Sequence, residues 1–489
     1  MAISQSVPAS GYSPAAMKQT LSTNYIDFAN GTTGWEQQYL PDLMEKEAEV
    51  FGNRTISGFL SKVGAEESMT SDQVIWSEQG RLHLSYKNVA VANNAGELKL
   101  TMTSATDADG NAVAGSGLSH GIRPGDMLLV SDSNTTIQCF VQSLYAVAGT
   151  ADAIINCERY DGAVSGVTDL TGECVVLVYG SEYVKGSVGR VGANTPQFKT
   201  RSNKPIILKD KYEVSGSDAS AIGWVEVSGE EGQNGYLWYL KASGDTKARF
   251  SDYCEMALLE SVTANAAMSA SAVTSATGAV GGTEGLWEAL ASRGNISNVL
   301  DSGAGAAVLT EFDDILAELD SNGAIEENMM FLDRKTSLNI DDMLATLNAG
   351  YATGTSYGVF NNEEEMALNL GFTGFRRGSY DFYKSDFKYL NDASTRGLIN
   401  ATDSTNAIHG VMIPAGVSSV YDQGLGRNLK RPFLHVRYRA SNMESRKMKT
   451  WTTGSVGATT SDLDAMEMHF LSERCLVVQG ANNFVLLKG

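Results

Sequence analysis

The chain contains 489 residues, of which 57 are acidic and 37 are basic, and its formal net charge is −20 at pH 7. A surface that neutralises phosphate needs positive charge, so this balance argues against a general nucleic-acid binder, although not against a protein that encloses DNA. Hydrophobic residues make up 43% of the chain and charged residues 19%, which indicates a folded protein with length for about three domains.

Cysteine usage and the first residues bear on where the chain is made. The five cysteines are odd in number and form no Cys-x-x-Cys pair, so we expect buried free thiols and synthesis in a reducing compartment. No basic segment followed by an apolar core opens the chain, which predicts no signal peptide. No apolar run approaches the roughly 18 residues of a membrane span, so we also expect no membrane partner.

The N-terminal region, residues 1–51, divides into two predicted parts. Residues 1–34 are rich in small and polar residues but also carry aromatic and aliphatic side chains. This composition favours an extended arm that docks on another surface, rather than a disordered tail. Residues 35–51 have helical spacing and are strongly acidic. These carboxylates are either a solvated helix face or one side of a charge-paired interface; the contact candidates are Glu36, Glu45, Glu47 and Glu49.

The next segment predicts a projecting hairpin with a β domain inserted into it. Alternating apolar residues predict strands at 74–78 and 81–89, with Gly80 at the turn, and we assign residues 52–92 and 193–200 to this hairpin. Residues 93–192 are rich in small residues and turn signals, which predicts a small antiparallel sandwich or barrel. Its expected strands are Leu98–Thr103, Met127–Ser131, Thr136–Leu144, Ala153–Arg159 and Cys174–Tyr179.

A long helix is predicted in the middle of the chain, from about Tyr236 to Met268. Apolar side chains recur at helical spacing from Phe250 to Leu258, and charged residues occupy the other faces. At 1.5 Å per residue, such a helix would be about 45–50 Å long, which suits a beam that connects separate lobes. The small residues of 269–283 then predict a connector without a core.

The remainder of the chain predicts alternating helices and strands. Thr310 is placed to cap a helix that Asn322 and Gly323 end, and a short apolar run at 329–332 predicts a buried strand. Further strands are expected at 408–413, 433–438 and 476–487. The predicted fold class is therefore α+β.

Few motifs point to chemistry. Residues 354–358 match the Gly-x-Ser-x-Gly pattern around Ser356, but no buried strand precedes them and no helix opens directly after them. The five histidines are scattered, with no zinc spacing, and no phosphate-binding loop is present. We predict no catalytic residue, no metal site and no cofactor.

The strongest charge feature is a basic segment from Arg427 to Lys449, with eight cationic residues against the single acid Glu444. It could be a solvated face, a contact to DNA phosphate, or a surface that pairs with a neighbouring copy. The acidic residues 36–49 are a plausible complement, since such complementarity fixes the register of an interface. The contact candidates here are Arg427, Lys430, Arg431, Arg437 and Arg439.

The order of these parts resembles the major capsid proteins of tailed bacteriophages, which have the Hong Kong 97-like fold. Residues 207–220 look like the stretch before the spine helix of that fold, and residues 247–264 look like the spine helix itself. Residues 329–334 resemble a strand–helix unit of the axial domain, and residues 469–478 resemble the closing strands. The likeness is closest to capsid subunits of crAss-like phages.

The resemblance implies a domain plan and a function. The E-loop is the hairpin with its inserted β domain; the other domains are the N-terminal arm (1–51), the peripheral domain with the spine helix (201–283), the axial domain (284–425) and the C-terminal closing strands (426–489). The implied function is self-assembly into hexamers and pentamers of an icosahedral shell around packaged double-stranded DNA.

The same resemblance implies partners and a location. The partners would be further copies of the chain, a portal, and minor or decoration proteins. The location would be the virion shell, after synthesis in the host bacterial cytoplasm. Three alternatives stay open: an encapsulin-like compartment or other virion subunit, a serine hydrolase that uses Ser356, and a carbohydrate-binding surface protein that uses the inserted β domain.

Overall fold

The computed structural model describes residues 65–217, 237–350 and 374–489, apart from short gaps within each range. These gaps are 95–96, 103, 109, 111, 114–119, 147–152, 163–169, 171–172, 191–197, 265–273, 276–277, 280, 298–299, 301–304, 324, 404, 416, 423–426 and 456–459. The chain divides into two compact units, and each is described by itself. Among the described residues, the first unit takes 208–255 and 448–472, and the second takes the rest.

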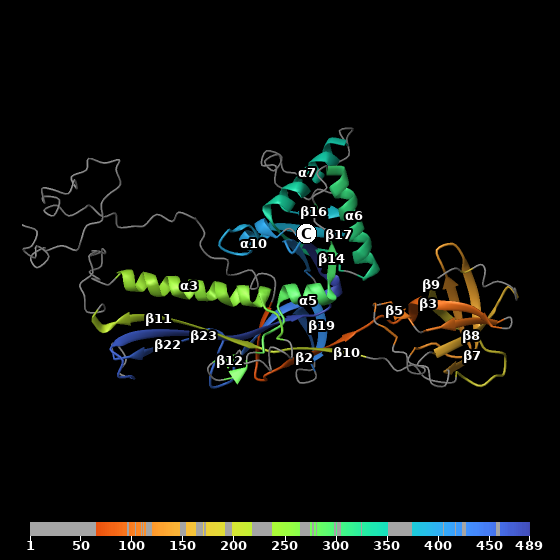
Figure 1. Cartoon of the computed structure of the whole chain (residues 1–489), viewed down its shortest axis with the longest axis horizontal. Coiled ribbons are helices and arrows are strands. Elements are labelled where there is room, and N and C mark those ends of the chain that lie inside the picture. Colours follow the sequence, from red (N-terminus) through yellow and green to blue (C-terminus); the bar gives the residue numbers. More distant parts are fainter. Residues whose placement is uncertain are drawn as a thin grey trace, which may run out of the picture. The chain divides into compact units, whose positions relative to one another are not determined.

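The first unit packs a long helix against β-strands. Helix α3 (Leu237–Glu260) lies along β11 (Ile206–Ser215) and β23 (Ala465–Val478) in Figure 1, and β22 (Lys449–Gly454) pairs antiparallel with β23. The buried side chains of Phe250 and Cys254 contact Phe470, whose ring centroid is 6.0 Å from that of Phe250. The helical spacing of the sequence therefore identified the face that packs.

Helix α3 is shorter than the sequence predicts. It ends at Glu260 and not near Met268, so its 24 residues span about 36 Å. After Glu260 the backbone pairs with another segment: Gly285 donates its N–H to the Ser261 carbonyl (2.8 Å), and Ala264 donates to the Gly281 carbonyl (3.0 Å). These contacts use groups that a longer helix would need for its own ladder.

In the second unit, a two-stranded hairpin carries the inserted domain. Strand β2 (Val74–Gln79) pairs antiparallel with β10 (Phe198–Asn203), in a register that runs from Val74 opposite Asn203 to Gln79 opposite Phe198. Strands β3–β9 come between these two paired strands in the chain. The predicted turn at Gly80 is wrong, because the following strand, β3 (Ser85–Asn94), pairs within the inserted domain and not with β2.

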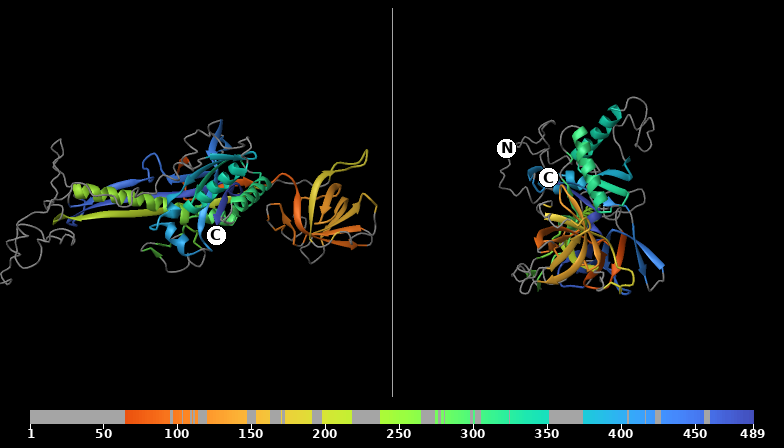
Figure 2. Two further views of the ribbon diagram at one scale, coloured as in Figure 1. Left: turned by 90° about the horizontal axis from the view of Figure 1, so that it is seen from above. Right: turned by 90° about the vertical axis from the view of Figure 1, so that its right-hand side faces the viewer.

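The inserted domain is a six-stranded antiparallel barrel, and it begins at β3 instead of the predicted residue 93. Its strands pair in the order β4, β8, β7, β6, β9 and β3, and a pairing of β3 with β4 closes the ring. In Figure 2 the orange and yellow strands curve around a common interior. All five predicted strands of this domain are present, as β4 (Glu97–Thr101), β6 (Asp126–Ser131), β7 (Thr136–Ala146), β8 (Ala153–Arg159) and β9 (Glu173–Ser181).

Alternate side chains of these strands fill the barrel. Val89, Leu100, Leu128, Val141 and Ile155 are each fully buried in this core. The thiols of Cys139, Cys157 and Cys174 lie in it too, and all five cysteines of the chain are buried and free, as expected. Burial raises the pKa of the Cys139 thiol to about 12, so it stays protonated and unreactive.

The remaining core of the second unit is a mixed sheet covered by helices. Its strand order is β14, β24, β18, β15, β17 and β16; β14 pairs parallel with β24 and β15 with β17, and the other pairs are antiparallel. The strands are β14 (Asn295–Ser297), β15 (Glu327–Leu332), β16 (Gly374–Arg377), β17 (Tyr380–Asp386), β18 (Ile408–Pro414) and β24 (Val485–Lys488). This mixture of helices and sheets fits the predicted α+β class.

Helix α6 (Gly305–Ser321) shows why this region folds as it does. Phe312 is fully buried, with its ring centroid 5.1 Å from Phe382 and 5.6 Å from Phe375. The helix begins before the predicted cap at Thr310, but its predicted end is confirmed: Asn322 bonds the Glu318 carbonyl, and Gly323 adopts a φ of +67°.

Shorter elements complete the described chain. They are β1 (Ala65–Met69), β5 (Thr106–Asp107), β12 (Thr274–Ser275), β13 (Gly278–Ala279), α5 (Leu286–Arg293), α7 (Arg334–Gly350), α9 (Lys388–Asn391), α10 (Arg396–Thr402), β19 (Val417–Asp422), β20 (Arg427–Pro432), β21 (Leu434–Arg439) and the 3₁₀ turn η4 (Ala481–Asn483). Within the described ranges, no helix combines the length and apolarity that crossing a bilayer requires.

The buried imidazole of His120 predicts that the barrel is sensitive to acid. The side chain is 2% exposed, neither ring nitrogen has a hydrogen-bond partner, and its ring meets Tyr86 edge-on. Burial, together with the Arg123 guanidinium, lowers the pKa of His120 to about 4. Because the folded pKa lies below the unfolded value, the stability that neutral His120 supplies is present above about pH 6.5 and is lost as the pH falls toward 4.

We expect the barrel to lose about 2 kcal/mol of stability between pH 7 and pH 5 from this group. A His120→Phe variant keeps the ring volume without the titration and should lose less over the same interval. Hydrogen exchange of barrel peptides in urea, compared between the two proteins at each pH, measures this difference. Equal losses in both proteins would contradict a role for His120.

Candidate functional site at the basic strand and the hairpin root

The basic segment lies partly on a strand whose neighbour is acidic. Strand β21 pairs antiparallel with β23 and parallel with β1, whose sequence is Ala-Glu-Glu-Ser-Met. This register places Glu67 directly opposite Arg437 and Met69 opposite Arg439. Cations and carboxylates from segments far apart in sequence therefore meet on one sheet of the second unit.

These side chains form a group of ion pairs, here named the charged seam. Arg437 bonds Glu67 at 2.7 Å, and Lys447 pairs with Glu66. A single carboxylate, Glu473, forms ion pairs with two arginines, at 2.9 Å from Arg439 and 2.7 Å from Arg446. Arg439 also pairs with Asp72 (2.5 Å). The Glu473 side chain is only 6% exposed, so removing its arginine partners would leave a buried carboxylate uncompensated.

The seam revises the interpretation of the basic segment. Arg437 and Arg439 already have carboxylate partners within the chain, supplied by β1, Asp72 and Glu473. The sequence interpretation had looked for those partners in residues 36–49 instead. The acidic pair in β1 was a usable signal, but only its parallel pairing with β21 reveals the partnership.

The other contact candidates are placed as follows. Strand β20 carries Arg427, Lys430 and Arg431 and pairs with β19 (Val417–Asp422); the structure describes the backbone of β20 but not these side chains. Glu36, Glu45, Glu47 and Glu49 lie outside the described residues, as does Ser356. Their proposed contacts with a neighbouring copy stay predictions.

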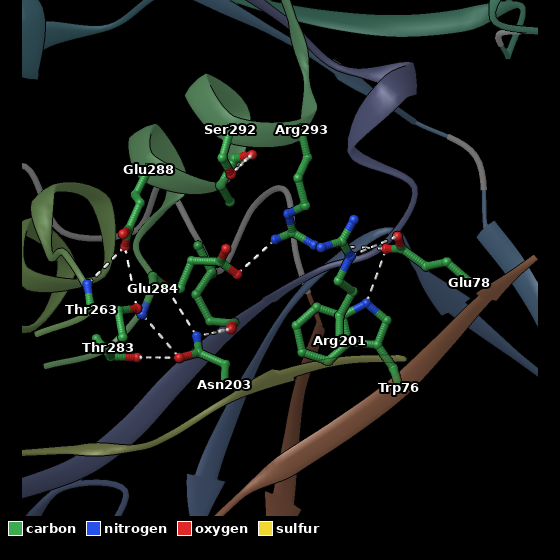
Figure 3. Close-up of polar contacts among 12 residues, drawn as sticks. Trp76, Glu78, Arg201, Asn203, Thr263, Thr283, Glu284, Glu288, Ser292 and Arg293 are labelled. Atoms are coloured by element: carbon green, nitrogen blue, oxygen red, sulfur yellow. Dashed lines mark hydrogen bonds and ion pairs between the residues drawn. The ribbon is translucent and has the colours of Figure 1, made fainter. Parts of the chain in front are cut away.

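A second polar centre lies where the hairpin meets the rest of the second unit. The amide of Asn203, at the end of β10, is 4% exposed. Its nitrogen donates to the carbonyls of Glu284 (3.0 Å) and Leu476 (2.7 Å), and its oxygen accepts from the Thr283 hydroxyl and the Glu284 N–H, both at 2.9 Å (Figure 3). One side chain thus ties β10 to the segment before α5 and to β23.

Charged groups surround this amide. Arg293, on α5, bonds Glu284 at 2.6 Å and lies 3.9 Å from Glu78 on β2, and its guanidinium sits 5.8 Å from the Trp76 ring centroid. Figure 3 shows Arg201 approaching the same Glu78 carboxylate from β10. Burial raises the pKa of Glu284, and Arg293 opposes that rise. The root of the hairpin is therefore a pre-ordered, nearly charge-balanced joint.

The end of α3 forms a third polar centre in the second unit. The Glu260 carboxylate accepts from Trp287 on α5 (3.2 Å), Tyr389 on α9 (2.6 Å) and Arg396 on α10 (2.5 Å). Burial and the bond to Glu260 raise the pKa of Tyr389, so its hydroxyl remains a donor. This carboxylate fixes three helices to the point where α3 stops.

His409 and Asp333 form a close histidine–carboxylate pair. His409 Nδ1 lies 2.8 Å from Asp333, which also accepts the Thr336 N–H (2.7 Å) as the cap of α7. Burial alone would raise the pKa of Asp333, but its bonds to His409 and Thr336 hold that pKa below the ordinary value. The pair therefore stabilises a helix start. In the part of the chain described, no group of three acidic, His or Cys side chains is placed to hold a metal.

We expect Asn203→Ala to destabilise the second unit by about 3 kcal/mol. The substitution leaves buried donors and carbonyls at the hairpin root without hydrogen-bond partners. The free-energy cost of these unsatisfied groups exceeds the loss of the hydrogen bonds themselves. Urea unfolding followed by tryptophan fluorescence measures the change, since Trp76 and Trp287 lie at or beside this joint. The exposed Asn482→Ala is the control, and a loss no larger than in the control would refute the assignment.

The seam changes what charge reversal should do. The sequence alone suggested that reversing Arg437 and Arg439 impairs assembly more than folding. Because both arginines neutralise carboxylates within the chain, we now expect Arg437→Glu/Arg439→Glu to lower the unfolding free energy by on the order of 3 kcal/mol. Urea unfolding at low and high salt measures this. An unchanged midpoint would show that the seam adds no stability.

Comparisons with known proteins add the following. No protein-family model matches the sequence, and no curated protein matches it either. Among solved structures, a chain of the capsid structure of the cyanophage P-SCSP1u aligns over 97% of this chain and 99% of its own length, with 10% identity and a TM-score of 0.40. A chain from Microbacterium phage Oxtober96 aligns over 93% and 97%, with 7% identity and a TM-score of 0.37. A chain from Gordonia phage Cozz aligns over 97% and 98%, with 10% identity and a TM-score of 0.36. At TM-scores this low, the similarity alone assigns neither fold nor function.

Proposed function

We propose that this chain is the major capsid protein of a tailed bacteriophage, with a Hong Kong 97-like fold. The observation that carries the proposal is the order of its parts. A hairpin interrupted by a barrel (β2, β3–β9 and β10) precedes the long helix α3, and a mixed sheet follows. The C-terminal strand β24 then returns to that sheet and pairs between β14 and β18. This is the plan that the sequence resemblance implies.

Two physical features support a shell subunit. The hairpin root is fixed by the buried amide of Asn203, so a projecting hairpin would be held at a defined angle without a partner present. The charged seam pairs Arg437, Arg439, Arg446 and Lys447 of the basic segment with carboxylates of the chain itself. With a net charge of −20, such a subunit would enclose DNA without binding it tightly.

The finer parts of the proposal follow from the same family. The subunit would form hexamers and pentamers of an icosahedral shell around double-stranded DNA, together with a portal and minor or decoration proteins. It would be made in the cytoplasm of a bacterial host, and a crAss-like phage is the origin that the sequence favours. Contacts among several neighbours would add up through multivalency, so no single interface needs to be strong.

Electron microscopy of the purified protein tests the proposal. We expect negatively stained samples to contain closed shells, or rings of five and six subunits, because a capsid subunit assembles through many repeated contacts. Sedimentation velocity at rising protein concentration gives the matching solution measurement. A protein that stays monomeric at high concentration in both experiments would overturn the assignment. A Ser356→Ala variant should assemble as the parent does.

A further inference from the structure

A groove lies on the outside of the inserted barrel. It encloses about 640 Å³, within the usual range for small-ligand sites. Its floor is built from Phe140 and Gln142 on β7, Glu158 on β8 and Tyr160 just beyond that strand. These side chains alternate with fully buried neighbours such as Val141, so they are on the face away from the barrel core.

The segment that leaves β9 forms the wall of the groove and is held in place. Arg190, at its far end, pairs at 2.8 Å with the fully buried Asp126, and the Glu182 N–H donates to the Gly125 carbonyl (2.9 Å). Gly125 has a φ of +90°, and a Cβ there would lie 2.9 Å from the Tyr183 ring. Only glycine therefore lets that ring take its position. The conformation of this wall segment is thus fixed by specific contacts.

The groove presents apolar surface to solvent. Tyr160 and Tyr183 are 47% and 41% exposed, and Val184 and Val188 are each 81% exposed. Exposed apolar side chains that gather around one hollow, unlike scattered ones, are typical of a binding surface. Aromatic rings supply flat apolar faces, while the tyrosine hydroxyls keep a polar edge.

Two carboxylates, Glu158 and Glu182, give the groove strong hydrogen-bond acceptors. The Tyr160 hydroxyl donates to Glu182 (2.6 Å), and the Gln142 amide donates to Glu158. Burial and the nearby Glu182 raise the pKa of Tyr160 to about 12, so the hydroxyl stays a donor. Each carboxylate has lone pairs for about four bonds, so one internal donor leaves capacity for a ligand's hydroxyl groups.

The structure argues against two other kinds of occupant. The groove holds two carboxylates and one arginine, Arg159, whose guanidinium is already paired with Asp161 (2.6 Å). This balance disfavours an anionic ligand such as nucleic acid or an acidic lipid. A peptide that adds as a strand needs an unpaired sheet edge. The strands beneath the groove have no such edge, because β6, β7 and β8 each pair with a strand on both sides, in the order β4, β8, β7, β6 and β9. A peptide therefore cannot bind here by adding a strand to β6, β7 or β8.

We propose that this groove binds a neutral oligosaccharide. Sugar rings have flat C–H faces that stack on tyrosine and phenylalanine, and their hydroxyls would donate to Glu158 and Glu182. The inference does not depend on the chain's being a shell subunit, because the barrel would present this surface in any assembly state. On a shell, it would give the particle a weak, repeated attachment to glycans, strengthened by multivalency.

The test is binding of the full-length protein to immobilised neutral oligosaccharides of glucose, galactose, mannose or N-acetylglucosamine. Sulfated and sialylated glycans and unrelated peptides are the comparison probes. We expect binding to at least one neutral glycan, and calorimetric titration of that glycan should show affinity about tenfold weaker in Tyr160→Ala and in Tyr183→Ala. Glu158→Gln should also weaken binding, since it removes a charged acceptor.

Tyr383→Ala is the matched control, because this tyrosine of β17 is 50% exposed and lies outside the groove. Its glycan affinity should equal that of the parent, and circular dichroism should confirm that all variants are folded. Three results would overturn the inference: no neutral glycan binds, the groove variants bind as well as the control, or only anionic glycans or peptides bind.

Discussion

The buried amide of Asn203 is the constraint on which the hairpin depends. A two-stranded hairpin is only marginally stable by itself, so β2 and β10 need support from their surroundings. Asn203 provides it by satisfying donors and acceptors on the segment before α5 and on β23 at once. Because a buried polar group without partners is costly, this joint has one favourable geometry and resists gradual bending. Arg293 and Glu284 reinforce it with charge, and Trp76 covers the guanidinium.

Local sequence patterns predicted the features that depend only on neighbouring residues, such as strand positions and one helix end. Alternation along β6 and β7 located the barrel strands, because each buries every second side chain. Asn322 and Gly323 marked the end of α6, because a left-handed residue terminates a helix wherever it occurs. The end of α3 was missed for the opposite reason. Residues after Glu260 could continue a helix by themselves, but Ser261 and Ala264 instead pair with Gly285 and Gly281, which are distant in sequence.

In the candidate site, too, the local features were predicted from the sequence and the contacts between distant segments were not. The basic character of β21 was evident from composition, and the prediction of a charge-paired surface followed directly. The carboxylate partners of β21 were not evident from the sequence. The pairing of β1 with β21 is parallel and brings Glu67 to Arg437 across most of the chain. Glu473 was hidden for another reason. It lies in β23 between Ser472 and Arg474, and nothing in that local sequence indicates that its side chain is buried. This burial makes the ion pairs with Arg439 and Arg446 matter more than the pair with the exposed Asp72.

The geometry of the insertion explains why the barrel can carry an activity of its own. Its first strand, β3, pairs with its last, β9, with Ser85 opposite Leu177, so the barrel begins and ends at neighbouring positions. The hairpin offers a matching pair of ends, because Gln79 and Phe198 are opposite each other on β2 and β10. A domain with adjacent ends can therefore be inserted without distorting the hairpin. The barrel closes its own sheet and has its own core, so residues on its outer face are not required by the hairpin joint. Tyr160 and Tyr183 are such residues, and their exposure is more simply explained by a ligand than by the fold.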